Sequence, residues 1–451
     1  MANRLRLVAT LAAVAGLVLP TAGSAVATNS VPPKKTFAYT GSEQSYVVPA
    51  GVVLLGVAVE GGHGGEYAAQ AGEGGGRDGG VGALLPVTPH EKLYVEVGSA
   101  GVYAGGPVFG GGGAAGAPPP VVCRTSQGAA CSAAYASSGG GASDVRTCSL
   151  SAGRCPGGVS PIASRLIVGG GGGGQGGSGN GPMVQCGASS GGGRANSFQY
   201  PPGKAGAGPL PVTTAAGTVY PGYPTSDDLQ NGVTPAGGGR AAPGAGGRQA
   251  GCSSGSTGFT DSVAGSQAAG PVGGTGGNAS SLGPMYSGCV QSTNDCFDAG
   301  AGGGGGGGYF GGGGGATGLD KSTGSCGVCN GAGSGQGGGG GSSFVSKRMR
   351  YPVDESLVKS AWNGWAIVVP VIEIDSPAPG AVYHPGHVVR ARWACGYDGQ
   401  TGLGISQKCV GSVAEGKAIS TRPGKHSFKV SGVVQSNGNH TVTATATYTV
   451  K

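Results

Sequence analysis

The chain has 451 residues, of which 105 are glycine and only 10% are charged. So much glycine argues against an ordinary globular core, and so little charge argues against the highly charged kind of disorder. The formal net charge of +7 comes without clusters of lysine or arginine, which excludes the electrostatic pattern of a nucleic-acid-binding protein.

Residues 1–27 have the layout of a secretory signal peptide. Arg4 and Arg6 precede an apolar stretch from Leu7 to Leu19, and the small residues Ala25-Val26-Ala27 follow. This stretch is shorter than the ~20 residues that a membrane-spanning helix needs. We therefore expect cleavage after Ala27 and export. No later segment is long enough to span a membrane, so we expect an extracellular protein whose retention at the cell surface, if any, is noncovalent.

The twelve cysteines all follow the signal peptide. An even number of cysteines in an exported chain predicts disulfides, although their connectivity stays open. Short spacings suggest five local pairs and leave Cys186 and Cys252 for a longer one. The local pairs are Cys123 with Cys131, Cys148 with Cys155, Cys289 with Cys296, Cys326 with Cys329, and Cys395 with Cys409. A redox or zinc role for Cys326 and Cys329 is less favoured, because no helix start or further ligand accompanies them.

Alternating apolar residues predict β-strands along the first part of the chain. Residues 37–60 and 81–97 each have the pattern of a hairpin, the first with a turn at Pro49-Ala50-Gly51. Further strands are expected at 165–168 and at 365–369, immediately before Pro370.

Glycine runs lie between these strands, at 110–113, 139–141, 169–174, 191–193, 237–239, 302–308, 311–315 and 337–341. They lack the repeat of collagen. One interpretation is flexible linkers, since glycine loses much conformational entropy on ordering. We favour extended three-fold helices of the polyproline type, packed side by side and hydrogen bonded to one another through the backbone. Disulfides at the edges of such a bundle would shorten its loops.

The composition changes at Val371, where glycine becomes rarer and valine and threonine more frequent. Strands expected at 371–374, 388–393, 426–430 and 440–450 predict a small β-sandwich. We expect a signal peptide at 1–27, a linker at 28–36, a glycine-rich domain at 37–369 and a second domain at 370–451.

Several motifs in the glycine-rich part resemble those of a known domain. They are Phe37-Ala38-Tyr39-Thr40-Gly41, Tyr46-Val47-Val48-Pro49-Ala50-Gly51, Gly139-Gly140-Gly141-Ala142-Ser143-Asp144-Val145-Arg146, Ser164-Arg165-Leu166-Ile167-Val168 with the glycines after it, Gly338-Gly339-Gly340-Gly341-Ser342-Ser343-Phe344-Val345 and Asn363-Gly364-Trp365-Ala366-Ile367-Val368. In this order they resemble the glycine-rich domain of bacterial secreted proteins and of the extracellular parts of the anaplastic lymphoma kinase and leukocyte tyrosine kinase receptors. The resemblance implies an all-β, jelly-roll-like sandwich with inserted polyglycine-II-type helices, and in the receptors it implies binding of protein ligands. It does not imply kinase activity, because the catalytic-loop, Asp-Phe-Gly and strand-lysine motifs are absent.

The C-terminal part resembles bacterial immunoglobulin-like modules of extracellular proteins. The matching residues include Trp393-Ala394-Cys395, Cys409-Val410-Gly411, Pro423-Gly424-Lys425-His426 and the last strand, 441–450. This resemblance implies a disulfide between Cys395 and Cys409.

Catalysis has little support in the sequence. Gly187-Ala188-Ser189-Ser190-Gly191 and Gly251-Cys252-Ser253-Ser254-Gly255 fit the pattern of a hydrolase nucleophile, but neither lies between a strand and a helix as that chemistry requires. Glu60, Glu66, Glu73 and Asp78 could bind calcium, yet they fit no calcium-loop spacing and are more simply solvated. We therefore expect no enzyme, no cofactor and no metal.

Tyrosines in Gly/Pro-rich connections are the better candidates for binding, because they offer a large contact area at small entropic cost. They are Tyr67, Tyr103, Tyr200, Tyr220, Tyr223 and Tyr309, and they could equally fill gaps in the glycine bundle. The leading hypothesis is a non-enzymatic structural or adhesion-type protein that binds a cell-surface polymer or an unknown protein. A secreted ligand or receptor-like signalling module with one specific partner is the alternative, and a hydrolase with an unrecognised site is the third.

Overall fold

The structure is a computed structural model. It describes residues 31–66, 74–117, 135–177, 301–316, 335–354, 362–435 and 438–451, together with short pieces at 212–213, 217–220, 242, 244, 259–260, 272 and 320–321. The expected signal peptide lies outside these residues.

The described part of the chain is all-β, as the sequence predicts. Its strands form mainly antiparallel sheets, and its helices are single 3-10 turns, η1 (Leu150–Ala152), η2 (Pro156–Gly158) and η3 (Ile162–Ser164). None of these turns has the length or the apolar character of a membrane-crossing helix.

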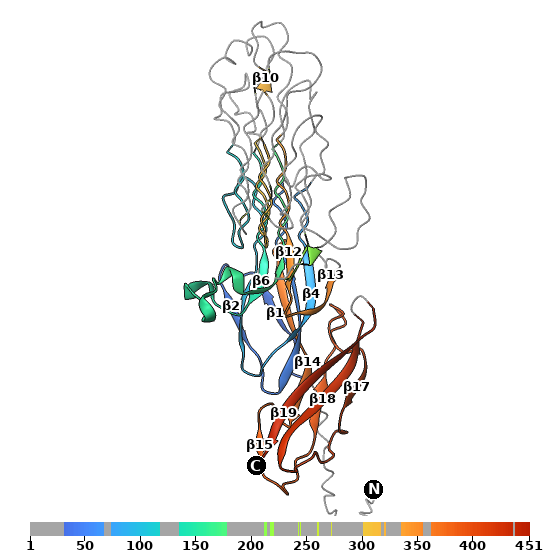
Figure 1. The fold of residues 1–451 in the computed structure, drawn as a ribbon. Helices are drawn as coiled ribbons and strands as arrows, with labels where there is room; N and C mark the ends of the chain where they lie inside the picture. Colours follow the sequence, from blue (N-terminus) through green and yellow to red (C-terminus); the bar gives the residue numbers. More distant parts are fainter. Residues whose placement is uncertain are drawn as a thin grey trace, which may run out of the picture.

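Two large sheets form the centre of the molecule (Figure 1). The strand order of the first sheet is β1 (Lys35–Ala38), β14 (Trp365–Ser376), β3 (Val52–Glu60), β4 (Gly80–Pro86) and β13 (Arg350–Asp354), and β16 (Arg392–Cys395) also pairs with β14. The order of the second is β2 (Gln44–Val47), β5 (Lys92–Glu96), β6 (Ser143–Arg146), β7 (Arg165–Gly169), β12 (Ser343–Ser346), β9 (Gly217–Tyr220) and β8 (Val212–Thr213). A separate pair joins β10 (Phe259–Thr260) to β11 (Asp320–Lys321).

One apolar core joins the two sheets. Val57 and Leu85 of the first sheet belong to the same buried cluster as Leu93, Val145 and Ile167 of the second. The chain passes from one sheet to the other between β2 and β3, and again between β4 and β5. The expected hairpins at 37–60 and 81–97 are therefore wrong. Alternation predicts the strands, but it does not say which strands are partners.

A third sheet consists of β15 (Val382–Tyr383), β19 (His440–Val450), β18 (Gly424–Val434) and β17 (Gln407–Gly411). Its inner side chains, such as Phe428 and Val442, share a second core with Leu54 and Ile372 of the first sheet. Because β3 has cores on both faces, all nine of its residues are buried and its apolar run is nearly continuous.

The change in composition at residues 370–371 falls inside a strand. Pro370 lies within β14 and opposite Leu55 of β3, and the same strand continues to its pairing with β16. Leu403, from the C-terminal part, packs against Gly56 so closely that a β-carbon there would lie 2.9 Å from the Leu403 Cβ. The C-terminal part is thus joined to the first sheet by a shared strand and by a shared core.

Several element boundaries differ from those expected. β1 begins at Lys35, inside the expected linker, because Lys35 and Thr36 pair with Val368 and Ile367. The strand expected at 388–393 is found as β16, at Arg392–Cys395. The strands β6, β12, β13 and β17 have no clear signal in the sequence, since most of them are short and carry polar or charged residues.

The described glycine runs extend from the two central sheets as neighbouring segments (Figure 1). We call these segments, at 61–66, 74–79, 98–106, 110–117, 136–142, 169–177, 301–308, 311–316 and 335–342, the glycine bundle. Their backbones are hydrogen bonded to one another, as the sequence interpretation expects. The runs at 191–193 and 237–239 lie outside the described residues.

The bonding of segment 169–177 repeats every third residue. The amides of Gly171, Gly174 and Gly177 donate to the carbonyls of Gly307, Gly304 and Ala301, each at 2.8 Å. The amides of Gly172 and Gln175 donate to Gly62 and Gly65 of another segment, each at 3.0 Å. Two successive positions of a three-residue repeat thus donate to two different neighbours, which is the periodicity of a three-fold extended helix.

Glycine is required at these contacts because the segments touch through their backbones. A β-carbon on Gly172 would lie 1.8 Å from the Gly76 carbonyl oxygen, and one on Gly341 would lie 1.8 Å from that of Gly307. Such distances are far below van der Waals contact, so a side chain would force the segments apart and break the bonds between them.

Gly172→Ala should therefore loosen the bundle. We expect a local destabilisation of about 3 kcal/mol, or roughly a hundredfold faster amide hydrogen exchange in residues 301–308, because the segments must separate to admit the methyl group. Gly106→Ala is the control, since a β-carbon at Gly106 meets nothing within 4 Å. Equal protection of residues 301–308 in both variants would contradict this account of the packing.

Candidate binding surface

A buried ion cluster lies on the second sheet, on the face opposite the shared core. Arg146 of β6 donates through Nε to Oδ1 of Asp144 at 2.7 Å, and its Nη2 forms ion pairs with both Asp144 and Glu96. These side chains alternate with Val95 and Val145, which point into the core. One guanidinium thus forms ion pairs with two carboxylates, and the side chain of Arg146 is fully buried.

Arg165 of β7 fixes the glycine bundle to this face of the sheet. Its Nη1 donates to the carbonyl of Gly308 at 3.0 Å and its Nη2 donates to that of Tyr309 at 3.3 Å. Its guanidinium lies 4.9 Å from the centre of the Tyr309 ring, which stacks on Phe344 of β12 at 4.0 Å. The turn between the runs at 302–308 and 311–315 is therefore held by charge, hydrogen bonds and ring packing together.

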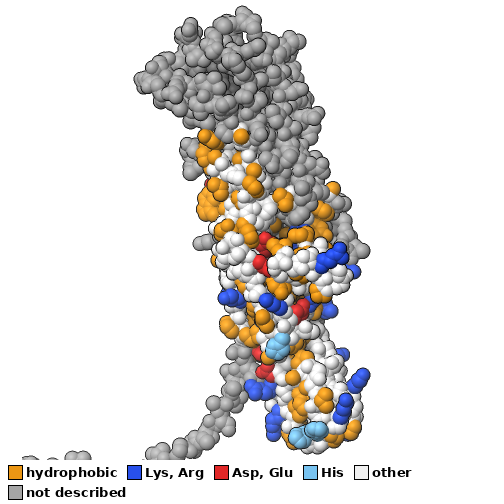
Figure 2. Space-filling model, turned by 90° about the vertical axis from the view of Figure 1, so that its left-hand side faces the viewer, with side chains coloured by type: hydrophobic (Ala, Val, Ile, Leu, Met, Phe, Trp, Pro, Cys, Tyr) orange, Lys and Arg blue, Asp and Glu red, His pale blue; other side chains and the backbone are white. Residues whose placement is uncertain are grey.

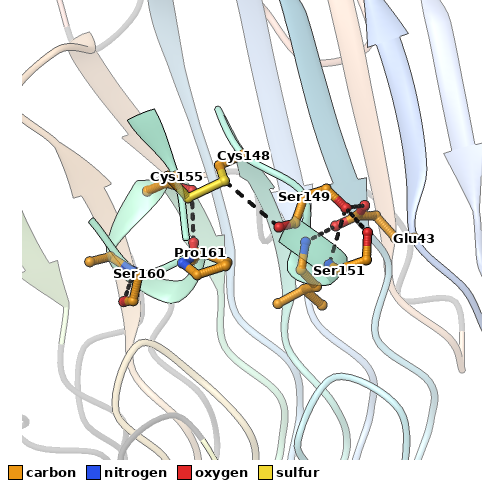
Figure 3. The surroundings of a disulfide bond; sticks show 10 residues. Glu43, Cys148, Ser149, Ser151, Cys155, Ser160 and Pro161 are labelled. Atoms are coloured by element: carbon orange, nitrogen blue, oxygen red, sulfur yellow. Dashed lines mark hydrogen bonds between the residues drawn. A yellow bond between two sulfur atoms is a disulfide. The ribbon is translucent and has the colours of Figure 1, made fainter. Parts of the chain in front are cut away.

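A disulfide-bonded loop follows β6 (Figure 3). Cys148 and Cys155 close it, and Ser149 Oγ donates to Glu43 Oε1 at 2.5 Å. The amide of Leu150 donates to the other oxygen of Glu43 at 2.7 Å. Glu43 immediately precedes β2, so this carboxylate holds the loop to the edge of the second sheet.

Four rings and one valine, most of them exposed, lie on neighbouring backbone segments at the bundle. We call this group the aromatic strip; its members are Trp362, His63, Val102, Tyr103 and Tyr135. The exposed fractions are 60% for Trp362, 55% for Val102, 38% for Tyr103 and 36% for Tyr135. The rings of His63 and Trp362 lie 5.7 Å apart, as do those of Tyr103 and Tyr135. Figure 2 shows hydrophobic side chains reaching the surface on the described part of the bundle.

Backbone hydrogen bonds set the positions of these rings. The His63 amide donates to the Trp362 carbonyl at 3.0 Å, and the Gly101 amide donates to the His63 carbonyl at 2.8 Å. The Ser138 amide donates to the Val102 carbonyl at 2.9 Å. The strip is therefore carried by segments 61–66 and 98–106 of the bundle and by Tyr135 and Trp362 beside them, and these bonds fix the backbone from which the rings project.

The part of the strip around Val102, Tyr103 and Tyr135 carries no charged residue, whereas the buried Asp78 interacts electrostatically with His63. Residues 99–104 and 135–138, which bear Val102, Tyr103 and Tyr135, contain no Asp, Glu, Lys or Arg. Ring faces and hydroxyl groups are thus the chemistry that this surface offers to a partner.

The structure separates the tyrosines singled out in the sequence. Tyr103 is exposed in the strip, whereas Tyr309 is only partly exposed and packs between Arg165 and Phe344. Tyr220 belongs to β9, but its side chain, like Tyr67, Tyr200 and Tyr223, lies outside the described structure. Trp362 is not among the residues predicted from the sequence, although a tryptophan directly before Asn363-Gly364 indicates an exposed turn position.

The disulfides predicted between Cys148 and Cys155 and between Cys395 and Cys409 are both confirmed. The remaining cysteines named as pairs lie outside the described residues: Cys123, Cys131, Cys186, Cys252, Cys289, Cys296, Cys326 and Cys329.

The acidic residues considered for calcium are not gathered as a ligand set. Glu66 accepts a bond from the Gly75 amide at 3.2 Å, whereas Glu60 and Asp78 are buried. Burial raises the pKa of Asp78, and a hydrogen bond with Glu60 opposes that rise. Within the described ranges, no three His, Cys, Asp or Glu side chains are placed to share a metal ion. Glu73 is outside them.

Comparison of the sequence with protein-family models and with curated proteins finds no match.

The ion cluster should make folding stability depend on pH. Burial, and then the charge of Asp144, raise the pKa of Glu96 from 4.5 to about 7. Between these values the folded protein holds a proton that the unfolded chain releases, so stability decreases as pH rises from about 4.5 to about 7. Glu373 should contribute to the same decrease in stability, because burial and the charge of Asp375 raise its pKa to about 7.

Glu96→Gln should remove part of this decrease, because the amide does not titrate and can still accept a bond from Arg146. Thermal midpoints measured from pH 4.5 to pH 7 should fall less steeply in this variant than in the parent, and least steeply in the double variant with Glu373→Gln. An unchanged slope in Glu96→Gln would show that Glu96 is ionised throughout this range.

Proposed function

We propose that this protein is an extracellular, non-enzymatic binding protein in which a rigid glycine bundle displays the aromatic strip to a neutral surface polymer. The observation that carries the proposal is the combination of exposed rings with backbone bonds that fix them. Rigid aromatic side chains lose little entropy on binding, so they are efficient contact groups.

A polysaccharide is the partner that best fits this chemistry. The faces of sugar rings present C–H groups that pack against aromatic rings, and their hydroxyls exchange hydrogen bonds with serine, tyrosine and backbone groups. The absence of Asp, Glu, Lys and Arg from residues 99–104 and 135–138 favours a neutral polymer over a charged one. A linear polymer can contact several rings at once, which raises avidity without a deep pocket.

We infer that the two central sheets form a jelly-roll-like sandwich, that the bundle consists of polyglycine-II-type helices, and that the C-terminal part is an immunoglobulin-like module. The three-residue repeat of the bundle hydrogen bonds and the Cys395–Cys409 disulfide support these inferences. The two disulfides accord with secretion into an oxidising environment.

Removing rings from the strip tests this function. Trp362→Ala and Tyr103→Ala should each weaken sedimentation of the oxidised protein with insoluble polysaccharides, for which chitin, cellulose and a bacterial cell-wall preparation are suitable probes. We expect a loss of about tenfold for each, equivalent to ~1.4 kcal/mol of contact energy.

Tyr397→Ala is the matched control, because Tyr397 is 48% exposed but lies on the C-terminal part, away from the strip. Equal loss in all three variants, or no binding of the parent protein to any of these polymers, would reject a polysaccharide partner. Tight stoichiometric capture of one soluble protein through Trp362 and Tyr103 would instead support the signalling-module alternative.

A further inference from the structure

Positive charge is concentrated in the C-terminal part of the chain. Residues 376–451 contain eight Lys and Arg residues and two acidic ones, whereas residues 28–375 contain 17 basic and 18 acidic residues. All eight cationic side chains are exposed. They are Arg390, Arg392, Lys408, Lys417, Arg422, Lys425, Lys429 and Lys451. Apart from Arg4 and Arg6 of the expected signal peptide, the net positive charge of the protein therefore comes from this one region, and Figure 2 shows Lys and Arg side chains around its lower part.

The two acidic residues of this region, Asp398 and Glu415, neutralise little of its positive charge. Asp398 is paired with Lys34, with Nζ and Oδ1 2.8 Å apart. Glu415 lies in the connection between β17 and β18, and β17, β18 and β19 contain no acidic residue. A polyanion approaching this sheet thus meets no carboxylate on its strands.

The outward face of the third sheet is open and bears lysines among hydroxyl groups. On β18 the buried Phe428 and Val430 alternate with exposed Lys425, Ser427 and Lys429. On β19 every second residue from Thr441 to Thr447 is an exposed threonine, and the residues between them are buried. The register places Lys429 opposite Thr445 and Lys425 opposite Thr449. Because the inward face is packed in the second core, this outward face is the one available for binding.

We propose that the outward face of β17, β18 and β19 docks a linear polymer with repeating phosphate groups. Lysine ammonium groups act as point charges for phosphate, and serine and threonine hydroxyls donate to phosphate oxygens. The strand rise of about 3.3 Å per residue separates Lys425 from Lys429 by roughly 13 Å, so both can contact an extended chain that lies along β18.

This docking surface is distinct from the aromatic strip, in both chemistry and position. Its occupant is charged and is bound in a salt-dependent way, whereas the strip offers uncharged rings. The two can therefore be tested separately, and failure of either leaves the other standing.

The experiment measures binding of long-chain inorganic polyphosphate to the full, oxidised protein by fluorescence anisotropy over a series of NaCl concentrations. The double variant K425S/K429S replaces both lysines by the residue type that alternates with them on β18. We expect its affinity at low salt to fall about tenfold or more, and the slope of log Kd against log [NaCl] to decrease by about 2, since two phosphate contacts are lost.

The control K92S/K347S removes the same charge from exposed lysines of β5 and of the connection after β12. It should bind nearly as the parent does, and so should Trp362→Ala. Equal loss in both double variants, or no binding of the parent at low salt, would overturn the proposal. Tighter binding of heparin or of duplex DNA than of polyphosphate would overturn the choice of a phosphate polymer as the occupant.

Discussion

The close approach of glycine backbones is the constraint on which the upper part of this molecule depends. Each bundle segment bonds to different neighbours at successive residues, and a β-carbon at most contact positions would lie well inside the van der Waals distance of a carbonyl oxygen. A bundle of this kind has little apolar surface to bury. Its order must therefore come from the saturation of amide and carbonyl groups, since an unpaired buried backbone group is costly.

The central sheets act as the foundation of the bundle, because hydrogen bonds between its segments do not fix the position of the bundle on the rest of the protein. The sheets fix this position through segments that continue directly from strands, as β7 continues into the run at 169–174. Arg165 of β7, beside the Arg146 cluster, donates to the backbone carbonyls of Gly308 and Tyr309 in the turn of the bundle. At the other end, β14 and the second core tie the third sheet to the same foundation. The long dimension of the described molecule is thus built from shared strands and cores rather than from linkers (Figure 1).

This construction gives two surfaces of opposite character on one body. The aromatic strip contains no Asp, Glu, Lys or Arg and lies at the glycine bundle, whereas the outward face of the third sheet bears lysines among hydroxyl groups. The occupants proposed above for these surfaces, a neutral polymer and a phosphate polymer, would be held at a fixed separation on this body.

The sequence by itself determined the β class, because alternation is a local signal. It also predicted both described disulfides among its suggested pairs, and it favoured ordered glycine runs over flexible linkers without deciding between them. It named Tyr103, one exposed ring of the strip, among six candidate tyrosines, but it did not separate exposed tyrosines from packed ones. Only the tertiary structure decided which strands are partners, as the wrong hairpins at 37–60 and 81–97 show. It also decided that Tyr309 packs while Trp362 is exposed, and that the lysines of β18 share an acid-free face. These outcomes depend on contacts between residues far apart in the chain, and no local pattern contains them.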